Sequence, residues 1–148
     1  MKAIETALSL TQAYKLGIER FEKMLGNEFA KAVEFMNNTS THIIVCGMGK
    51  SGLVGRKISS TLASTGTPSI FLHPAEAIHG DLGKVQKKSV VLLISYSGET
   101  GEIIALIPAL KRLDVNIIAL TGVKNSTLAN KSDIVLDTSV DREACPLN

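Results

Sequence analysis

Short apolar runs alternate along the chain with stretches whose apolar positions recur at helical spacing. The run at residues 90–94 contains only aliphatic residues, which is typical of a strand buried on both faces of a sheet. Four further segments predict strands: residues 42–46, 69–72, 115–120 and 134–137. Strands that alternate with helices favour right-handed βαβ units and a parallel sheet.

Helical patterns precede the first strand and separate the later ones. Residues 3–25 carry apolar side chains at helical spacing with Glu and Lys between them, and a second helical pattern ends at Asn37 and Asn38. Further helices are predicted at 53–64, 102–113 and 126–130, whereas 73–81 reads as a loop with one helical turn. The pattern predicts an α/β fold, a flavodoxin-like three-layer α/β/α sandwich with a five-stranded parallel sheet. The N-terminal helices either cover the sheet or pack against a second subunit.

Length and composition restrict the class of protein. The 148 residues predict one domain, with helices in residues 1–40 and an α/β core in residues 41–148. Aromatic residues make up 4% and the net charge is +2, so neither base stacking nor a basic surface indicates a nucleic-acid partner. No apolar run approaches the roughly 20 residues that span a bilayer, so no membrane partner is expected. Two distant cysteines without metal-ligand spacing favour a cytoplasmic setting.

The loop after the first strand has the sequence G-M-G-K-S-G, at residues 47–52. Its glycines allow backbone N–H groups to approach an anion, while Lys50 and Ser51 add a charge and a hydroxyl at a helix start. The match to a dinucleotide-binding fingerprint is loose, because the acidic residue expected about 20 positions later is missing. A tight turn without a ligand is the alternative interpretation.

The loop after the central apolar run has the sequence S-Y-S-G-E-T, at residues 95–100. Ligands of open parallel sheets lie outside the carboxyl ends of the strands, where helix amino termini favour anions. Ser95, Ser97 and Thr100 supply three hydroxyls around Gly98. Because a helix cap needs only one hydroxyl, this loop is predicted to bind an anion such as phosphate.

Several titratable residues flank these loops. Glu99 and Glu102 lie at a helix start, His73 and His79 in the loop after the second strand, and Glu143 in the tail. A carboxylate beside an anion site can act as a general base, although acidic residues also stabilise helix starts and tail charges are often only solvated. The two histidines lack metal-ligand spacing, so neither a metal nor a cofactor is predicted.

Longer segments carry a resemblance to a known family. They include G-M-G-K-S-G at 47–52, H-G-D-L-G at 79–83, S-Y-S-G-E at 95–99 and E-A-C-P-L at 143–147. From residue 42 onward the chain resembles the sugar isomerase (SIS) domain, and more narrowly the D-arabinose 5-phosphate isomerases of the capsule and lipopolysaccharide type. That family interconverts D-ribulose 5-phosphate and D-arabinose 5-phosphate through an enediol. The resemblance therefore implies an isomerase of carbohydrate metabolism.

The resemblance also implies roles for individual residues. The implied phosphate-binding residues are Ser51, Ser95, Ser97, Gly98 and Thr100. The implied catalytic residues are Lys50, His79, Glu102 and Glu143. Of these, Glu102 or Glu143 is the expected base, and His79 is expected to assist ring opening or oxygen-to-oxygen proton movement. Lys50 is expected to stabilise enediolate charge. A sugar phosphate is the implied ligand, and a homodimer or homotetramer the implied assembly.

The chain departs from the family pattern in two respects. Relatives continue after E-A-C-P-L into further helices with another active-site histidine, and many also carry CBS domains, so the natural chain is expected to continue past Asn148. Tyr96 stands where relatives often have a small polar residue. Two alternatives stay open: a non-catalytic SIS module that binds a sugar phosphate, and another phosphosugar isomerase, such as a phosphoheptose or hexulose phosphate enzyme.

Overall fold

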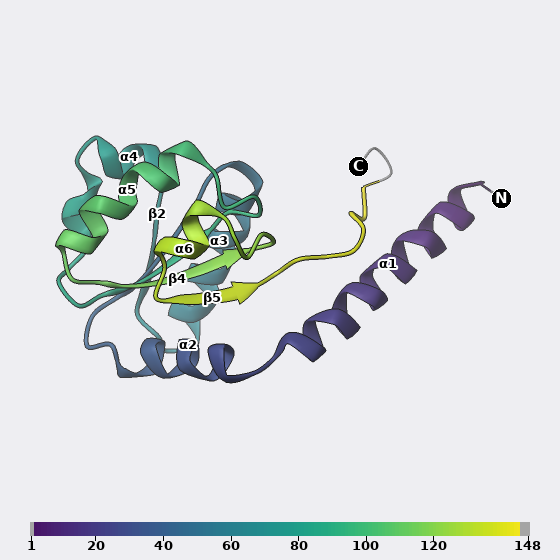
Figure 1. Cartoon of the computed structure of the whole chain (residues 1–148), viewed down its shortest axis with the longest axis horizontal. Coiled ribbons are helices and arrows are strands. Elements are labelled where there is room, and N and C mark those ends of the chain that lie inside the picture. The colour runs from purple at the N-terminus through teal and green to yellow at the C-terminus, as the bar shows by residue number, and fades with distance from the viewer. Residues whose placement is uncertain (1, 146–148) are drawn as a thin grey trace.

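A computed structural model describes residues 2–145, in which helices cover both faces of a parallel sheet (Figure 1). The strands are β1 (Ile43–Gly47), β2 (Ser69–Leu72), β3 (Val90–Ile94), β4 (Asn116–Thr121) and β5 (Ile134–Asp137). The helices are α1 (Lys2–Met24), α2 (Asn27–Asn38), α3 (Gly49–Ser64), α4 (Pro74–Ile78), α5 (Gly101–Arg112) and α6 (Thr127–Lys131), with a 3-10 turn η1 (Asp81–Lys84). All five predicted strands are present, each within one residue of its predicted ends.

The strands lie in the order β2-β1-β3-β4-β5, and all neighbours run parallel. This is the flavodoxin-like order, so the predicted fold class is confirmed. The chain leaves β1 for the β2 edge and then returns to the other side of β1 to form β3. The gap between β1 and β3 is therefore the topological switch point, where ligands of such sheets bind.

Aliphatic side chains fill both faces of the sheet. On one face, Ile103, Ile107 and Leu110 of α5 pack with strand residues such as Leu93. On the other face, Ala32 of α2 is fully buried against the strands, and α3 adds partly buried side chains. Figure 1 shows α4 and α5 above the sheet and α2 below it. β3 is buried along its whole length, as its unbroken apolar sequence predicts.

The glycine-rich segment after β1 differs from the sequence prediction. The pattern predicts a loop at 47–52 and a helix from residue 53, whereas α3 already begins at Gly49. A Cβ on Gly52 would lie only 2.6 Å from the carbonyl oxygen of Gly47. Glycine here allows the first turn of α3 to approach β1 closely, which makes the connection much tighter than a loop.

The two N-terminal helices behave differently. α2 packs on the sheet through Ala32, whereas α1 extends away from the sheet and buries none of its side chains (Figure 1). Large apolar residues of α1 are exposed, from 45% for Phe21 to 67% for Ile4. Thus α2 covers the sheet, and the apolar side of α1 is uncovered in the single chain. No helix within residues 2–145 is both long and apolar enough to cross a membrane.

Candidate active site

The loops that carry the predicted site residues begin at one edge of the sheet. The register pairs Gly47 with Ile94 and Cys46 with Leu72, so the segments after β1, β2 and β3 leave the sheet at the same level. These are carboxyl ends of parallel strands, and two of them border the switch point. The candidate site therefore lies between the β1–α3 and β3–α5 connections.

The loop between β3 and α5 is held in shape by its own hydroxyl groups. Ser95 is 2% exposed, and its Oγ lies 2.8 Å from Thr100 Oγ1 and accepts the Gly98 N–H at 3.1 Å. Gly98 has a φ of +67°, and a Cβ there would lie 2.0 Å from Ser126 Oγ. Position 98 therefore requires glycine for both its conformation and its lack of a side chain.

The outer side of the same loop offers hydrogen-bond donors. Ser97 is exposed, and its Oγ accepts the Glu99 N–H at 3.2 Å, which leaves the Ser97 hydroxyl hydrogen available. The Thr100 carbonyl accepts the Ile104 N–H at 3.0 Å, so the N–H groups before Ile104 have no partner within α5. These donors and the helix dipole suit a phosphate, whereas Ser95 and Thr100 chiefly shape the loop. Phosphate binding by the loop stays a prediction.

Glu99 braces the loop against α6. Its Oε1 accepts the Thr127 N–H at 2.6 Å, and this hydrogen bond lowers the pKa of Glu99 below its ordinary value. The Leu128 N–H adds a bond of 3.0 Å to the Gly98 carbonyl. A carboxylate with a lowered pKa is a weaker base than an ordinary one, and the contact that lowers it joins the loop to α6. The Glu99 carboxylate thus contacts the amino end of α6, where a negative charge is favourable.

Two residues at the end of β4 support the loop without having been assigned from sequence. Thr121 Oγ1 and the Gly122 N–H both donate to the Tyr96 carbonyl, at 3.1 Å and 2.9 Å. The Tyr96 ring lies against Gly122, because a Cβ there would be 2.5 Å from the ring. The sequence signal that could have identified Thr121 and Gly122 is that two small residues stand where a predicted strand ends at the ligand-binding edge of the sheet.

The loop at residues 95–100 is here called the hydroxyl loop. Lys50 and Ser51 lie across the switch point from it, in the first turn of α3. Lys50 is exposed and Ser51 is half-buried. Within residues 2–145, neither side chain forms a hydrogen bond or an ion pair. Both are therefore available to an anionic ligand at the carboxyl edge.

The predicted acid–base residues differ in their positions. Glu102 is half-buried in the first turn of α5, whereas His79 is exposed at the end of α4, which packs against α5. His73 follows β2, and its Nδ1 is buried without a hydrogen-bond partner in the described part of the chain. Glu102 and Lys50 thus stand in the two helix starts that flank the switch point.

Glu143 is exposed on the tail that follows β5. Figure 1 shows this tail passing beyond the carboxyl edge of the sheet toward α1. No ion pair among residues 2–145 joins Glu143 to Lys50, and none involves His79 or Glu102. The last three residues of the chain, which include the end of the E-A-C-P-L segment, lie outside the described residues. Within the described range, no three His, Cys, Asp or Glu side chains are grouped to hold a metal ion.

The family assignment follows from comparison with known sequences. The model of the SIS domain family matches residues 36–148, which include all five strands and both loops at the switch point. The chain belongs to the SIS domain family. The broad resemblance that the S-x-S-G-x-T loop carries is therefore confirmed, and the loops described above are those of a SIS domain.

Individual relatives narrow the comparison. The SIS chain is 53% identical over 124 residues to the arabinose 5-phosphate isomerase KdsD of Pseudomonas aeruginosa, covering 84% of this chain and 38% of that protein. Among solved structures, an Escherichia coli CFT073 protein in complex with arabinose 5-phosphate is 37% identical, with a TM-score of 0.84 and coverage of 99% of this chain and 80% of that one. A Listeria monocytogenes protein is 32% identical, with a TM-score of 0.93 and coverage of 98% and 76%. The chain spans about two fifths of the length of the curated relatives it matches.

Proposed function

We propose that this SIS domain is the catalytic core of an arabinose 5-phosphate isomerase, which interconverts D-ribulose 5-phosphate and D-arabinose 5-phosphate. The main support is the braced loop at 95–100, with Lys50 and Glu102 in the two helix starts that flank the switch point. The name of the Pseudomonas aeruginosa relative and the sugar phosphate bound to the Escherichia coli relative agree with this substrate class.

The proposed reaction moves a proton between neighbouring carbons through an enediol. The phosphate would bind at the amino end of α5, where the Ser97 hydroxyl and the first-turn N–H groups are free, with Ser51 on the opposite side. Glu102 lies in that same helix turn and would act on the carbons beyond the phosphate. Lys50 would oppose the charge of the enediolate oxygen, and His79 would assist ring opening or proton movement between oxygens.

Glu102 is the preferred base, because it belongs to the helix turn that also offers the phosphate donors. Replacing it with glutamine keeps the side-chain size and removes the base. We expect Glu102→Gln to lower kcat by roughly 10²–10⁴-fold, with a smaller change in KM, in a coupled assay with ribulose 5-phosphate. Glu34→Gln, on the exposed face of α2, is the matched control. A Glu102→Gln protein that turns over at the wild-type rate would exclude Glu102 as the base.

A binding module without catalysis is the second candidate. It is favoured by the lack of contacts among the acid–base candidates: no ion pair among residues 2–145 joins Glu143 to Lys50, and none involves His79 or Glu102. Arabinose 5-phosphate that binds the native state raises its melting temperature whether or not it reacts. Stabilisation without turnover would support the module, and turnover would reject it. Phosphoheptose and hexulose phosphate substrates in the same assay test the remaining isomerase alternative.

We propose a homodimer or homotetramer as the assembly. Exposed apolar residues of α1 adjoin a cavity of about 580 Å³ that Phe21, Met24 and Phe29 line together with β5. Contiguous apolar surface of this kind marks an interaction site. Light scattering that gave the mass of one chain would contradict the proposal.

A cytoplasmic setting is also proposed for the protein, because Cys46 and Cys145 are both free thiols.

A further inference from the structure

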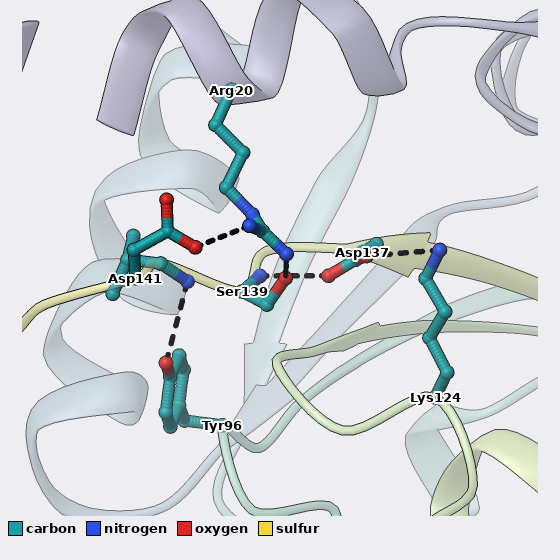
Figure 2. A network of polar contacts seen from close by, with 7 residues as sticks. Arg20, Tyr96, Lys124, Asp137, Ser139 and Asp141 are labelled. Atoms are coloured by element: carbon teal, nitrogen blue, oxygen red, sulfur yellow. Dashed lines mark hydrogen bonds and ion pairs between the residues drawn. The ribbon is translucent and has the colours of Figure 1, made fainter. Parts of the chain in front are cut away.

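Residues 138–145, here called the strap, run from the end of β5 along α1. The Arg20 guanidinium of α1 donates to the Asp141 carboxylate and, at 3.0 Å, to Ser139 Oγ (Figure 2). Farther along, Arg142 donates to Ser9 Oγ at 3.2 Å. Arg20 is partly enclosed by this arrangement, and its Nε is buried without a partner within residues 2–145. The strap is thus fastened to α1 at two places.

The strap is also fastened to the sheet where it begins. The Ser139 N–H donates to Asp137 Oδ1 at 2.8 Å, and Lys124 Nζ lies 3.1 Å from Asp137 Oδ2 (Figure 2). Asp137 is the last residue of β5, and Lys124 belongs to the β4–α6 connection. Ser139 therefore contacts both Asp137 and Arg20, which joins the sheet edge to α1.

A third contact joins the strap to the hydroxyl loop. The Val140 N–H points at the Tyr96 hydroxyl at 3.5 Å, the long end of hydrogen bonding (Figure 2). Tyr96 is held at its base, because its carbonyl accepts two hydrogen bonds and its ring lies against Gly122. The backbone of Tyr96, between Ser95 and Ser97, is therefore fixed, and the Tyr96 hydroxyl reaches the strap from it.

These contacts limit where Glu143 can lie. Glu143 is three residues beyond Val140, and an extended chain covers at most about 11 Å over three residues. With Val140 held at Tyr96, the Glu143 backbone stays within about 11 Å of Val140, and the bond from Arg142 to Ser9 directs the residue before Glu143 along α1. Without the contacts of Tyr96 and Arg20, the hydrogen bonds within residues 2–145 hold the strap only at its first two residues and far out along α1.

We propose that Arg20 and Tyr96 are positioning residues: they fasten the strap between α1 and the hydroxyl loop and so limit how far Glu143 can lie from a ligand bound at that loop. The role given to Glu143 rests on the proposed function. The attachment of the strap by Arg20 and Tyr96 can be tested without any turnover. It also gives Tyr96 a function that a small polar residue at this position lacks.

Trypsin cleavage after Arg142 reports directly on the fastening. Arg142 is exposed, but a protease must release the strap to bind it as an extended substrate. We expect Tyr96→Phe to raise the cleavage rate at Arg142 by about fivefold, the effect of one lost hydrogen bond on an opening equilibrium. Arg20→Gln, which removes the contacts to both Asp141 and Ser139, should raise it at least as much. Cleavage at Lys87 and Lys88, in an exposed loop away from the strap, supplies the internal reference. Gly17→Ala is the matched control on α1, because its Cβ would meet Val140 at an ordinary 3.8 Å.

Measurements of kcat and KM distinguish whether Arg20 and Tyr96 position Glu143 or have only a general structural role. Tyr96→Phe and Arg20→Gln should lower kcat more than they change KM, and Arg20→Lys should restore part of the loss. In a Glu143→Gln background the same changes should have little further effect, because there is no carboxylate left to position. Equal losses of kcat in the two backgrounds, or unchanged cleavage at Arg142, would overturn the inference. If the wild-type chain shows no turnover, the proposed function fails, and the cleavage rates alone decide whether Arg20 and Tyr96 fasten the strap.

Discussion

Replacing Gly98 with alanine tests how strongly the hydroxyl loop depends on its packing against α6. The residue has a φ of +67°, in the left-handed region, and a Cβ would lie 2.0 Å from Ser126 Oγ and 2.4 Å from Ser126 Cβ. Ser126 cannot simply turn away, because it is buried and its Oγ accepts the Ala129 N–H as the cap of α6. The substitution therefore forces the loop and α6 apart.

The expected cost follows from two separate effects. The left-handed conformation costs an alanine about 1–2 kcal/mol. The clash adds an overpacking cost of about 1–3 kcal/mol, because either the loop or the cap of α6 must shift. Gly98→Ala should therefore lower the free energy of unfolding by about 2–5 kcal/mol.

Comparison with Gly66→Ala separates the clash from the conformational cost. Gly66 has a φ of +94°, also in the left-handed region, but no atom lies within 4 Å of its Cβ position. Urea denaturation of both variants gives the two losses of stability, and unchanged m-values confirm that they are comparable. Gly98→Ala should lose about 1–3 kcal/mol more than Gly66→Ala. Equal losses would refute the argument that the loop is packed tightly against α6.

Three further predictions concern charge, burial and backbone conformation. Because the Thr127 hydrogen bond lowers the folded-state pKa of Glu99, its stabilising effect is present above the unfolded pKa and is lost as the pH falls through the folded value. The stability difference between wild type and Glu99→Gln, measured by urea denaturation, should therefore be largest near neutral pH and shrink below about pH 4.5. Burial raises the pKa of Cys46 to about 12, so a thiol reagent at pH 8 should modify exposed Cys145 alone in the native protein and both cysteines in urea; rapid native labelling of Cys46 would contradict its burial. Asp114 has a φ of +55°, so Asp114→Gly should raise the midpoint of thermal unfolding, by relief of about 1 kcal/mol of strain; a lower midpoint would show that the carboxylate stabilises this turn.

The strands were predictable because each depends on a local pattern. The apolar run of β3 is buried on both faces in the fold, and glycines and prolines separate it and its neighbours from the helices. The loops at the carboxyl edge were predictable for the same reason, since each directly follows a strand. Lys50 and Glu102 therefore stand where the sequence places them, in the helix starts at the switch point.

The partners of the loop residues were not predictable, because they depend on segments far away in the chain. Ser95 and Ser97 look alike in sequence, yet one is buried inside the loop and the other is exposed. Glu99 accepts a hydrogen bond from Thr127 of α6, and nothing near Glu99 in sequence identifies that partner. The direction of α1 was undetermined as well, since its apolar side does not reveal whether the sheet or another molecule covers it.

The brace behind the hydroxyl loop has a consequence for heat sensitivity. α6 has only five residues, and a helix of that length depends on its tertiary contacts for its existence. Its amino end nevertheless receives Glu99 and the Gly98 carbonyl, so melting of this one turn would remove the support at the Gly98–Glu99 side of the loop while the sheet stays folded. Ligand binding should therefore weaken on warming before the whole domain unfolds. Heat inactivation of this domain would then begin as a reversible local event.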